Sequence, residues 1–161
     1  MKNKIIITGI LMAGICYGSC EKKNDDGSLP APVVILNELG YENSMTAYAG
    51  SDLHIEAEIV AEGKIDKVSI DIHPEGGHAK SFLKTLQESE WVVDTTYTGF
   101  SGLKNTILHE HLDIPADADT GHYHFHLIVT DLEGQQTIVE EELEILHTPV
   151  KSLIVHPVNN Q

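Results

Sequence analysis

Histidines spaced one residue apart are the feature of this sequence best suited to chemistry. His109 and His111 form one His-x-His pair, and His122, His124 and His126 form a longer row. Side chains alternate between the two faces of a β-strand, so residues two apart lie on the same face. Neutral imidazole binds zinc and copper(II), and a site for these ions needs several such groups converging on one point. The spacing therefore indicates a metal-binding face on a sheet.

The strand that carries the longer row is the clearest element of the chain. Between Gly121 and Thr130, apolar side chains alternate with the histidines and should form one face of the core. The turn Asp131–Gly134 follows, and Thr137–Leu146 is the predicted last strand, in which Glu141 would mark a bulge. A hairpin centred on residue 133 would set a glutamate opposite each histidine. The expected pairs are His126 with Glu140, His124 with Glu142 and His122 with Glu144.

Short strands with turn signals between them recur along the chain, and no amphipathic helix of useful length is evident. Residues 81–90 could form a short helix, and residues 37–50 are a broken edge region. About seven or eight strands at this spacing predict an all-β fold, an antiparallel β-sandwich. The other predicted strands are Pro32–Leu36, Leu53–Val60, Lys67–His73, Trp91–Thr98 and Thr106–Ile114.

The start of the histidine-rich strand resembles the tyrosine corner of immunoglobulin-like domains. The residues that carry the resemblance are Asp119-Thr-Gly121-His-Tyr123, and Val129-Thr-Asp131-x-x-Gly134 continues it into a hairpin similar to the last one of bacterial surface modules. The resemblance implies that the Tyr123 hydroxyl bonds back to the backbone. Residues 32–146 resemble an uncharacterised Bacteroidetes-type surface lipoprotein family with an immunoglobulin-like domain, a resemblance that implies no particular activity.

In an immunoglobulin-like topology, the third strand flanks the histidine row and runs antiparallel to it. Asp71 and His73, at the end of that strand, should then lie near the start of the row, and His78 follows in the next loop. The predicted metal-binding face comprises His73, His78, His122 and His124, with Asp71 and Glu144 beside them.

His109 and His111 lie on a strand that this topology assigns to the opposite sheet. Because packed sheets are about 10 Å apart, outward-facing side chains there cannot join His122 and His124. We therefore expect the pair to form a second metal site, or to contribute only near the corner at 115–121. The histidines interpreted as isolated surface or edge residues are His54, His147 and His156.

The N-terminal residues have the pattern of a lipoprotein export signal. Lys2 and Lys4 precede an apolar run too short to span a membrane, and small residues precede Cys20. This arrangement resembles the lipobox of bacterial lipoproteins, which implies that Cys20 becomes the lipidated N-terminus; secretion with Cys20 left free is the alternative. The expected organisation is a signal peptide at 1–19, a lipidated cysteine and tether at 20–30, an immunoglobulin-like β-sandwich at 31–147 and a tail at 148–161.

The amino-acid composition of the chain excludes two kinds of binding. The formal net charge is −15 and the chain contains no arginine. Nucleic-acid binding needs clustered cations, and bidentate clamping of phosphate or carboxylate substrates needs arginine, so both are excluded. The only cysteines are Cys16, in the predicted signal, and Cys20, so no structural disulfide is expected.

Two functions remain open at this level. The first is an extracytoplasmic module, lipid-anchored at the outer membrane or cell surface, that binds zinc or copper through the histidine face and uses no organic cofactor. The second is an adhesion or scaffolding module that binds a surface protein or glycan through Trp91, Tyr97 and Phe100, unless these aromatics pack in the core; the histidine face is then an ordinary solvated sheet. We do not expect an enzyme, because no positioned nucleophile or general base is evident.

Overall fold

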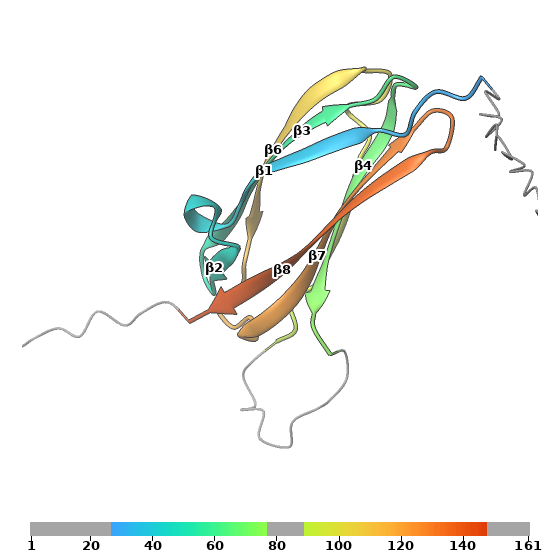
Figure 1. The fold of residues 1–161 in the computed structure, drawn as a ribbon. Helices are drawn as coiled ribbons and strands as arrows, with labels where there is room; N and C mark the ends of the chain where they lie inside the picture. Colours follow the sequence, from blue (N-terminus) through green and yellow to red (C-terminus); the bar gives the residue numbers. More distant parts are fainter. Residues whose placement is uncertain (1–26, 77–88, 148–161) are drawn as a thin grey trace, which may run out of the picture.

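The computed structural model describes residues 27–76 and 89–147, which form two β-sheets packed face to face (Figure 1). The predicted signal peptide, Cys20, His78, His156 and the tail at 148–161 lie outside the described residues, as does most of the short helix predicted at 81–90. Within the described ranges, no helix is long and apolar enough to cross a membrane.

Eight strands build the two sheets of the described region. The smaller sheet has the order β1-β3-β6, and the larger sheet has the order β2-β8-β7-β4-β5. Every neighbouring pair is antiparallel except β2 and β8, which are parallel. The predicted immunoglobulin-like β-sandwich is therefore confirmed, with this one parallel pair as a departure. The elements are β1 (Val33–Leu39), the 3-10 turn η1 (Tyr41–Asn43), β2 (Thr46–Tyr48), β3 (Asp52–Val60), β4 (Ile65–Pro74), β5 (Val93–Tyr97), β6 (Asn105–Asp113), β7 (Gly121–Asp131) and β8 (Gln136–Leu146).

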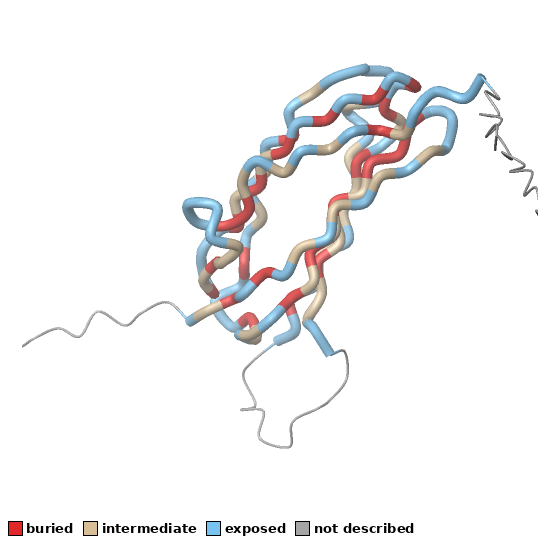
Figure 2. The backbone as a smooth tube through the Cα atoms, viewed as in Figure 1, coloured by how far each residue is buried: buried red, intermediate tan, exposed pale blue. Residues whose placement is uncertain are grey.

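The core lies between the sheets and takes every second side chain of the central strands. On β7 the buried side chains Tyr123, Phe125 and Leu127 alternate with the histidines, as predicted, and β3 shows the same alternation. Buried and more exposed positions accordingly alternate along the strands in Figure 2. Burying one large apolar side chain contributes about 1.5–3 kcal/mol, and this contribution fixes which face of each strand turns outward. The histidines are therefore held on the outer faces by the packing of their neighbours.

The aromatic side chains of the irregular region belong to the core rather than to a contact surface. Trp91 is only 6% exposed, and its ring lies 6.0 Å from the ring of Tyr123. Tyr97 and Phe100 are partly buried against the same core, with their rings 6.5 Å apart. The alternative considered from the sequence is therefore confirmed for Trp91, which packs inside the core, while Tyr97 and Phe100 pack against the core from partly buried positions.

The β7–β8 hairpin has the predicted register. His126 pairs with Glu140, His124 with Glu142 and His122 with Glu144. The prediction of a bulge at Glu141 is wrong, because pairing runs without a shift along the whole hairpin. Glu141 pairs with Phe125 and is half-buried, so its carboxylate can stay hydrated without any distortion of the strand.

A tyrosine corner closes the start of β7. The hydroxyl of Tyr123 donates a hydrogen bond of 2.8 Å to the carbonyl oxygen of Asp119, as the resemblance implied. Burial raises the pKa of Tyr123 above its usual value, so the hydroxyl remains a protonated donor. The bond ties the turn that precedes β7 to the strand that carries the histidine row.

Replacing Tyr123 with phenylalanine tests the contribution of this corner. The ring and its packing remain while the hydrogen bond is lost, so the free energy of unfolding should fall by about 0.5–1.5 kcal/mol. Urea unfolding followed by circular dichroism measures the change. Tyr41→Phe, at a largely exposed position, is the control and should change stability by less than about 0.5 kcal/mol. Equal stability of the two variants would contradict a stabilising corner.

Candidate metal sites

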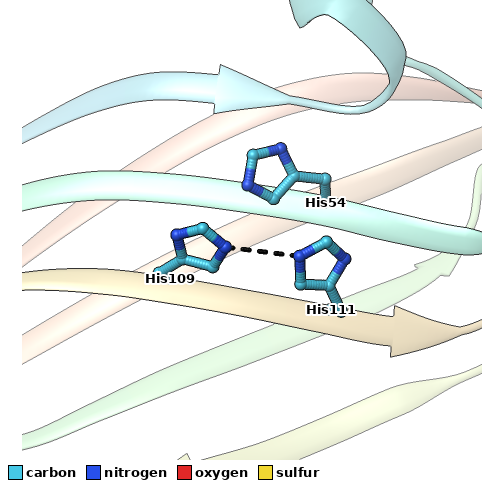
Figure 3. A group of neighbouring side chains, drawn as sticks. All are labelled: His54, His109 and His111. Carbon is cyan, nitrogen blue, oxygen red and sulfur yellow. Dashed lines mark hydrogen bonds between the residues drawn. The ribbon is translucent and has the colours of Figure 1, made fainter.

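Three histidines gather on the outer face of the smaller sheet. His54 comes from β3, and His109 and His111 come from the neighbouring strand β6 (Figure 3). His54 and His111 are direct cross-strand partners. The ring centroids are 4.8 Å apart for His54 and His111, 4.9 Å for His54 and His109, and 5.3 Å for His109 and His111. Strand pairing thus brings three imidazoles into one cluster, which we call the three-histidine cluster.

The nitrogen atoms of this cluster have spacings that suit a shared ion. The Nε2 atoms of His109 and His111 are 3.3 Å apart, and Figure 3 shows them facing each other. The candidate ligand atoms of all three residues lie within 4.8 Å of one another. Two ligand atoms of a tetrahedral zinc ion, each bound at about 2.0–2.1 Å, are about 3.3–3.4 Å apart. His109 and His111 already have this separation, and the candidate ligand atom of His54 lies within 4.8 Å of both.

Each imidazole also has a carboxylate beside its Nδ1 atom. The Nδ1–oxygen distances are 2.5 Å for His111 and Asp52, 3.4 Å for His54 and Glu38, and 3.7 Å for His109 and Glu56. The hydrogen bond from His111 lowers the pKa of Asp52, which keeps that carboxylate ionised. Metal-binding histidines commonly donate their second ring N–H to a carboxylate, which fixes the tautomer and the ring orientation. Such a tautomer, with the proton on Nδ1, leaves Nε2 free to act as a ligand.

His54 carries an atom that lacks a partner. Its Nε2 is buried and has no hydrogen bond within the described part of the chain. A buried polar nitrogen without a partner costs about 1–3 kcal/mol, and an ion bound at this nitrogen would satisfy it. The prediction that His54 is an isolated surface or edge residue is therefore wrong, because pairing of β3 with β6 stacks its ring on His111. His147, by contrast, is exposed and belongs to none of the candidate metal groups in the described residues.

An open surface pocket adjoins the three-histidine cluster. Its lining includes Ser51, Asp52, His111 and Ile114. More than half of the side-chain surface of His109 and of His111 is accessible to solvent. An ion held by three imidazoles here would keep a coordination position that water or another ligand could reach.

The histidine row of the larger sheet is divided differently from the prediction. His73 and His124 are direct partners across β4 and β7, with ring centroids 5.3 Å apart. His122 instead lies with Glu75 and Glu142, and its Nδ1 is 2.6 Å from a Glu142 oxygen. The ligand atoms that approach within 4.8 Å on β4 and β7 belong to Asp71, His73 and His126.

The position of Asp71 explains this division. Asp71 pairs with His126 rather than lying beside His122. The register of β4 against β7 therefore differs from the expected one by one histidine of the row. Glu144 opposes His122 in the hairpin, as expected, although the close carboxylate contact of the His122 ring is with Glu142. His109 and His111 lie in the opposite sheet from this row, as predicted. The described chain therefore has imidazole groups on both outer faces.

Residues 18–146 match the family described as "Domain of unknown function (DUF4625)", so the chain belongs to this family. No curated protein matches the chain. Among solved structures, it is similar to the GspB Siglec domain, with 18% identity and a TM-score of 0.47 over 76% of this chain and 60% of that one. The chain thus spans 60% of the length of that structure.

Two further solved structures show weaker similarity. The sporulation control protein Spo0M from Bacillus subtilis has 8% identity and a TM-score of 0.46, over 75% of this chain and 51% of that one. The soluble domain of PmoD from Methylocystis sp. has 10% identity and a TM-score of 0.40, over 74% of this chain and 95% of that one.

Proposed function

We propose that this member of the DUF4625 family is a lipid-anchored extracytoplasmic module that binds a divalent transition metal, zinc or copper, through His54, His109 and His111. The observation that carries the proposal is the 3.3 Å separation of the His109 and His111 Nε2 atoms, with a third imidazole beside them whose buried Nε2 has no partner in the described region. The carboxylates at the three Nδ1 atoms support it, because they would orient the rings toward an ion.

An ordinary solvated sheet face explains these observations less well. Cross-strand His–carboxylate pairs, worth about 0.2–1 kcal/mol each, would account for the acids next to the rings. They would not account for the buried Nε2 of His54, which has no hydrogen-bond partner within the described region. If the rings are protonated, like charges oppose one another. If they are neutral with the proton on Nδ1, the facing Nε2 atoms of His109 and His111 have no proton to share at their separation of 3.3 Å. A bound cation removes both difficulties.

The ligand set narrows the choice of ion. Three imidazoles without a thiolate suit zinc or copper(II), and copper(II) generally binds such sites more tightly than zinc does. The carboxylates of Glu38, Asp52 and Glu56 surround the cluster, and their negative charge favours a cation over an anion. We therefore propose a metal-capture function rather than catalysis.

The proposed location follows from the N-terminal sequence. Small residues precede Cys20, and a charged segment links it to the first strand at Val33. Lipidation at Cys20 would hold the β-sandwich at the outer membrane or cell surface by a short tether. There it would meet metal ions outside the cytoplasm.

Zinc titration followed by the imidazole ¹H–¹⁵N NMR signals tests this proposal at the residues themselves. The sample is tag-free protein treated with a chelator and dialysed, and single histidine-to-alanine variants assign the signals. We expect the ring signals of His54, His109 and His111 to shift together while the first equivalents of zinc are added, and then to stay constant. The signals of exposed His147 are the internal control and should not move.

Copper is tested separately, because copper(II) broadens NMR signals of nearby nuclei. Calorimetry with copper(II) and with zinc should give saturable binding that weakens about 10-fold or more in His54→Ala. The comparison is made in a His73→Ala/His126→Ala background, which removes the neighbouring imidazoles on the larger sheet. Ring signals of the three-histidine cluster that stay unchanged at millimolar zinc, together with no saturable copper binding, would overturn the proposal.

A further inference from the structure

The larger sheet has a second group of metal-ligand side chains at its centre. Asp71 and His73 lie two residues apart on the same face of β4, and His126 on β7 is the direct partner of Asp71. Diagonal neighbours on one sheet face are within reach of long side chains. The rings of His73 and His126 are accordingly 5.5 Å apart, and the candidate ligand atoms of the three residues lie within 4.8 Å of one another.

This group is more enclosed than the three-histidine cluster. All three residues are half-buried, and the side chain of His126 is 25% exposed. β5 and β8 flank β4 and β7 on either side, so the ligands project from the two inner strands of a continuous sheet. Rigid, paired strands hold side chains with less reorganisation than loops do. The group is therefore well positioned before any ion arrives.

The charges around the group are those that a cation would balance. Asp71 is the direct cross-strand partner of Asp94 on β5, and like charges directly opposite one another destabilise a sheet. On the other side, a Glu140 oxygen lies 4.0 Å from Nε2 of His126. The cross-strand row thus reads Asp94, Asp71, His126, Glu140, and no lysine occupies a position in it. A divalent ion at Asp71 would relieve the repulsion between the two aspartates.

We infer that Asp71, His73 and His126 form a second divalent-metal site, independent of the three-histidine cluster and on the opposite face of the sandwich. The two sites lie on different sheets, because β3 and β6 belong to one and β4 and β7 to the other. The module then carries two ions per chain. This inference does not depend on metal binding at the three-histidine cluster.

The ligand chemistry of the second site differs from that of the first. One carboxylate and two imidazoles form a mixed oxygen–nitrogen set, which accepts zinc and also harder divalent ions such as cobalt(II) or manganese(II). The three-histidine cluster offers nitrogen only and favours zinc and copper(II). Manganese(II) should therefore distinguish the sites, binding more tightly at Asp71, His73 and His126 than at the other face.

Zinc stoichiometry in paired variants tests the inference. Calorimetry of tag-free protein should give two zinc ions per chain for the wild type, and one each for His73→Ala/His126→Ala and for His109→Ala/His111→Ala. All of these positions lie on outer faces, so the core should stay intact; circular dichroism checks this. His147→Ala is the control, because His147 is exposed and belongs to none of the candidate metal groups of the described residues, and it should retain both ions.

The outcomes separate this inference from the proposed function. If His109→Ala/His111→Ala binds no zinc, or if its remaining ion survives His73→Ala/His126→Ala, the second site is overturned. If His73→Ala/His126→Ala binds none while His109→Ala/His111→Ala keeps one, the second site stands and the proposed function fails. Asp71→Asn supplies a further check, since it removes the charged oxygen ligand with little change in volume and should weaken manganese(II) binding about 10-fold or more.

Discussion

Replacing His109 and His111 together with alanine should weaken zinc binding at the smaller sheet by more than about 100-fold. Loss of one supporting hydrogen-bond partner alone commonly costs about 10–100-fold in metal affinity, and this variant removes two of three direct ligands. His54 would remain as a single imidazole, which cannot hold the ion by itself. The measurement is calorimetry in a His73→Ala/His126→Ala background, so that the opposite face does not contribute.

The control for this experiment is His147→Ala in the same background. His147 is exposed and lies outside the candidate metal groups of the described chain, so its removal should leave the zinc affinity within about twofold of its parent. When no metal is present, His109→Ala/His111→Ala loses the hydrogen bond from His111 to Asp52 and should unfold at a slightly lower urea concentration than the parent. His147→Ala should unfold at the same concentration as the parent. Zinc affinity that survives in His109→Ala/His111→Ala would show that the ion is held elsewhere.

Replacing Phe125 with alanine should lower the free energy of unfolding by about 3–5 kcal/mol. Phe125 is fully buried at the centre of β7, between His124 and His126 in the chain. Small domains are stable by only about 5–15 kcal/mol, so the variant should lose much of its folded population at modest urea concentrations. Urea unfolding measured by tryptophan fluorescence reports the change, because Trp91 packs in the same core.

Leu132→Ala is the comparison for the core variant. Leu132 is a large apolar residue that is mostly exposed in the β7–β8 turn, so truncating it should cost less than about 0.5 kcal/mol. A loss below about 1 kcal/mol in Phe125→Ala would contradict the packing described for β7. Core packing of β7 would then not be what holds the histidines on its outer face.

The features that depend on residues close together in the chain could be predicted from the sequence. The alternation from Tyr123 to Val129 predicted which face of β7 is buried, because the side-chain period of a strand is two. The short turn after Asp131 fixed the β7–β8 register, since the two strands are adjacent in the chain and the turn length determines the pairing. The tyrosine corner at Tyr123 was predicted from the resemblance to immunoglobulin-like domains, and its hydrogen bond joins residues only four apart in the chain.

The register between distant segments could not be predicted, although the resemblance to immunoglobulin-like domains indicated that β4 runs antiparallel beside β7. β3 and β6 are separated by two other strands in the chain order, and no single turn determines how His54 aligns with His111. Both segments alternate polar and apolar residues. This alternation predicts which side chains face outward, but it allows any register between the two strands that differs by two residues. The same limit explains why Asp71 was expected one pair away from its partner His126.

The position of β6 at the edge of the smaller sheet affects how this sheet can pair with other chains. Among the described strands, β6 has a hydrogen-bonded neighbour only on the β3 side. An exposed edge is where foreign chains can add by backbone pairing. An ion shared between His54 on β3 and His109 and His111 on β6 would cross-link that edge to its neighbour through side chains. Without bound metal, the pairing of β6 with β3 would be less stable. The protein would then be more prone to self-association along β6.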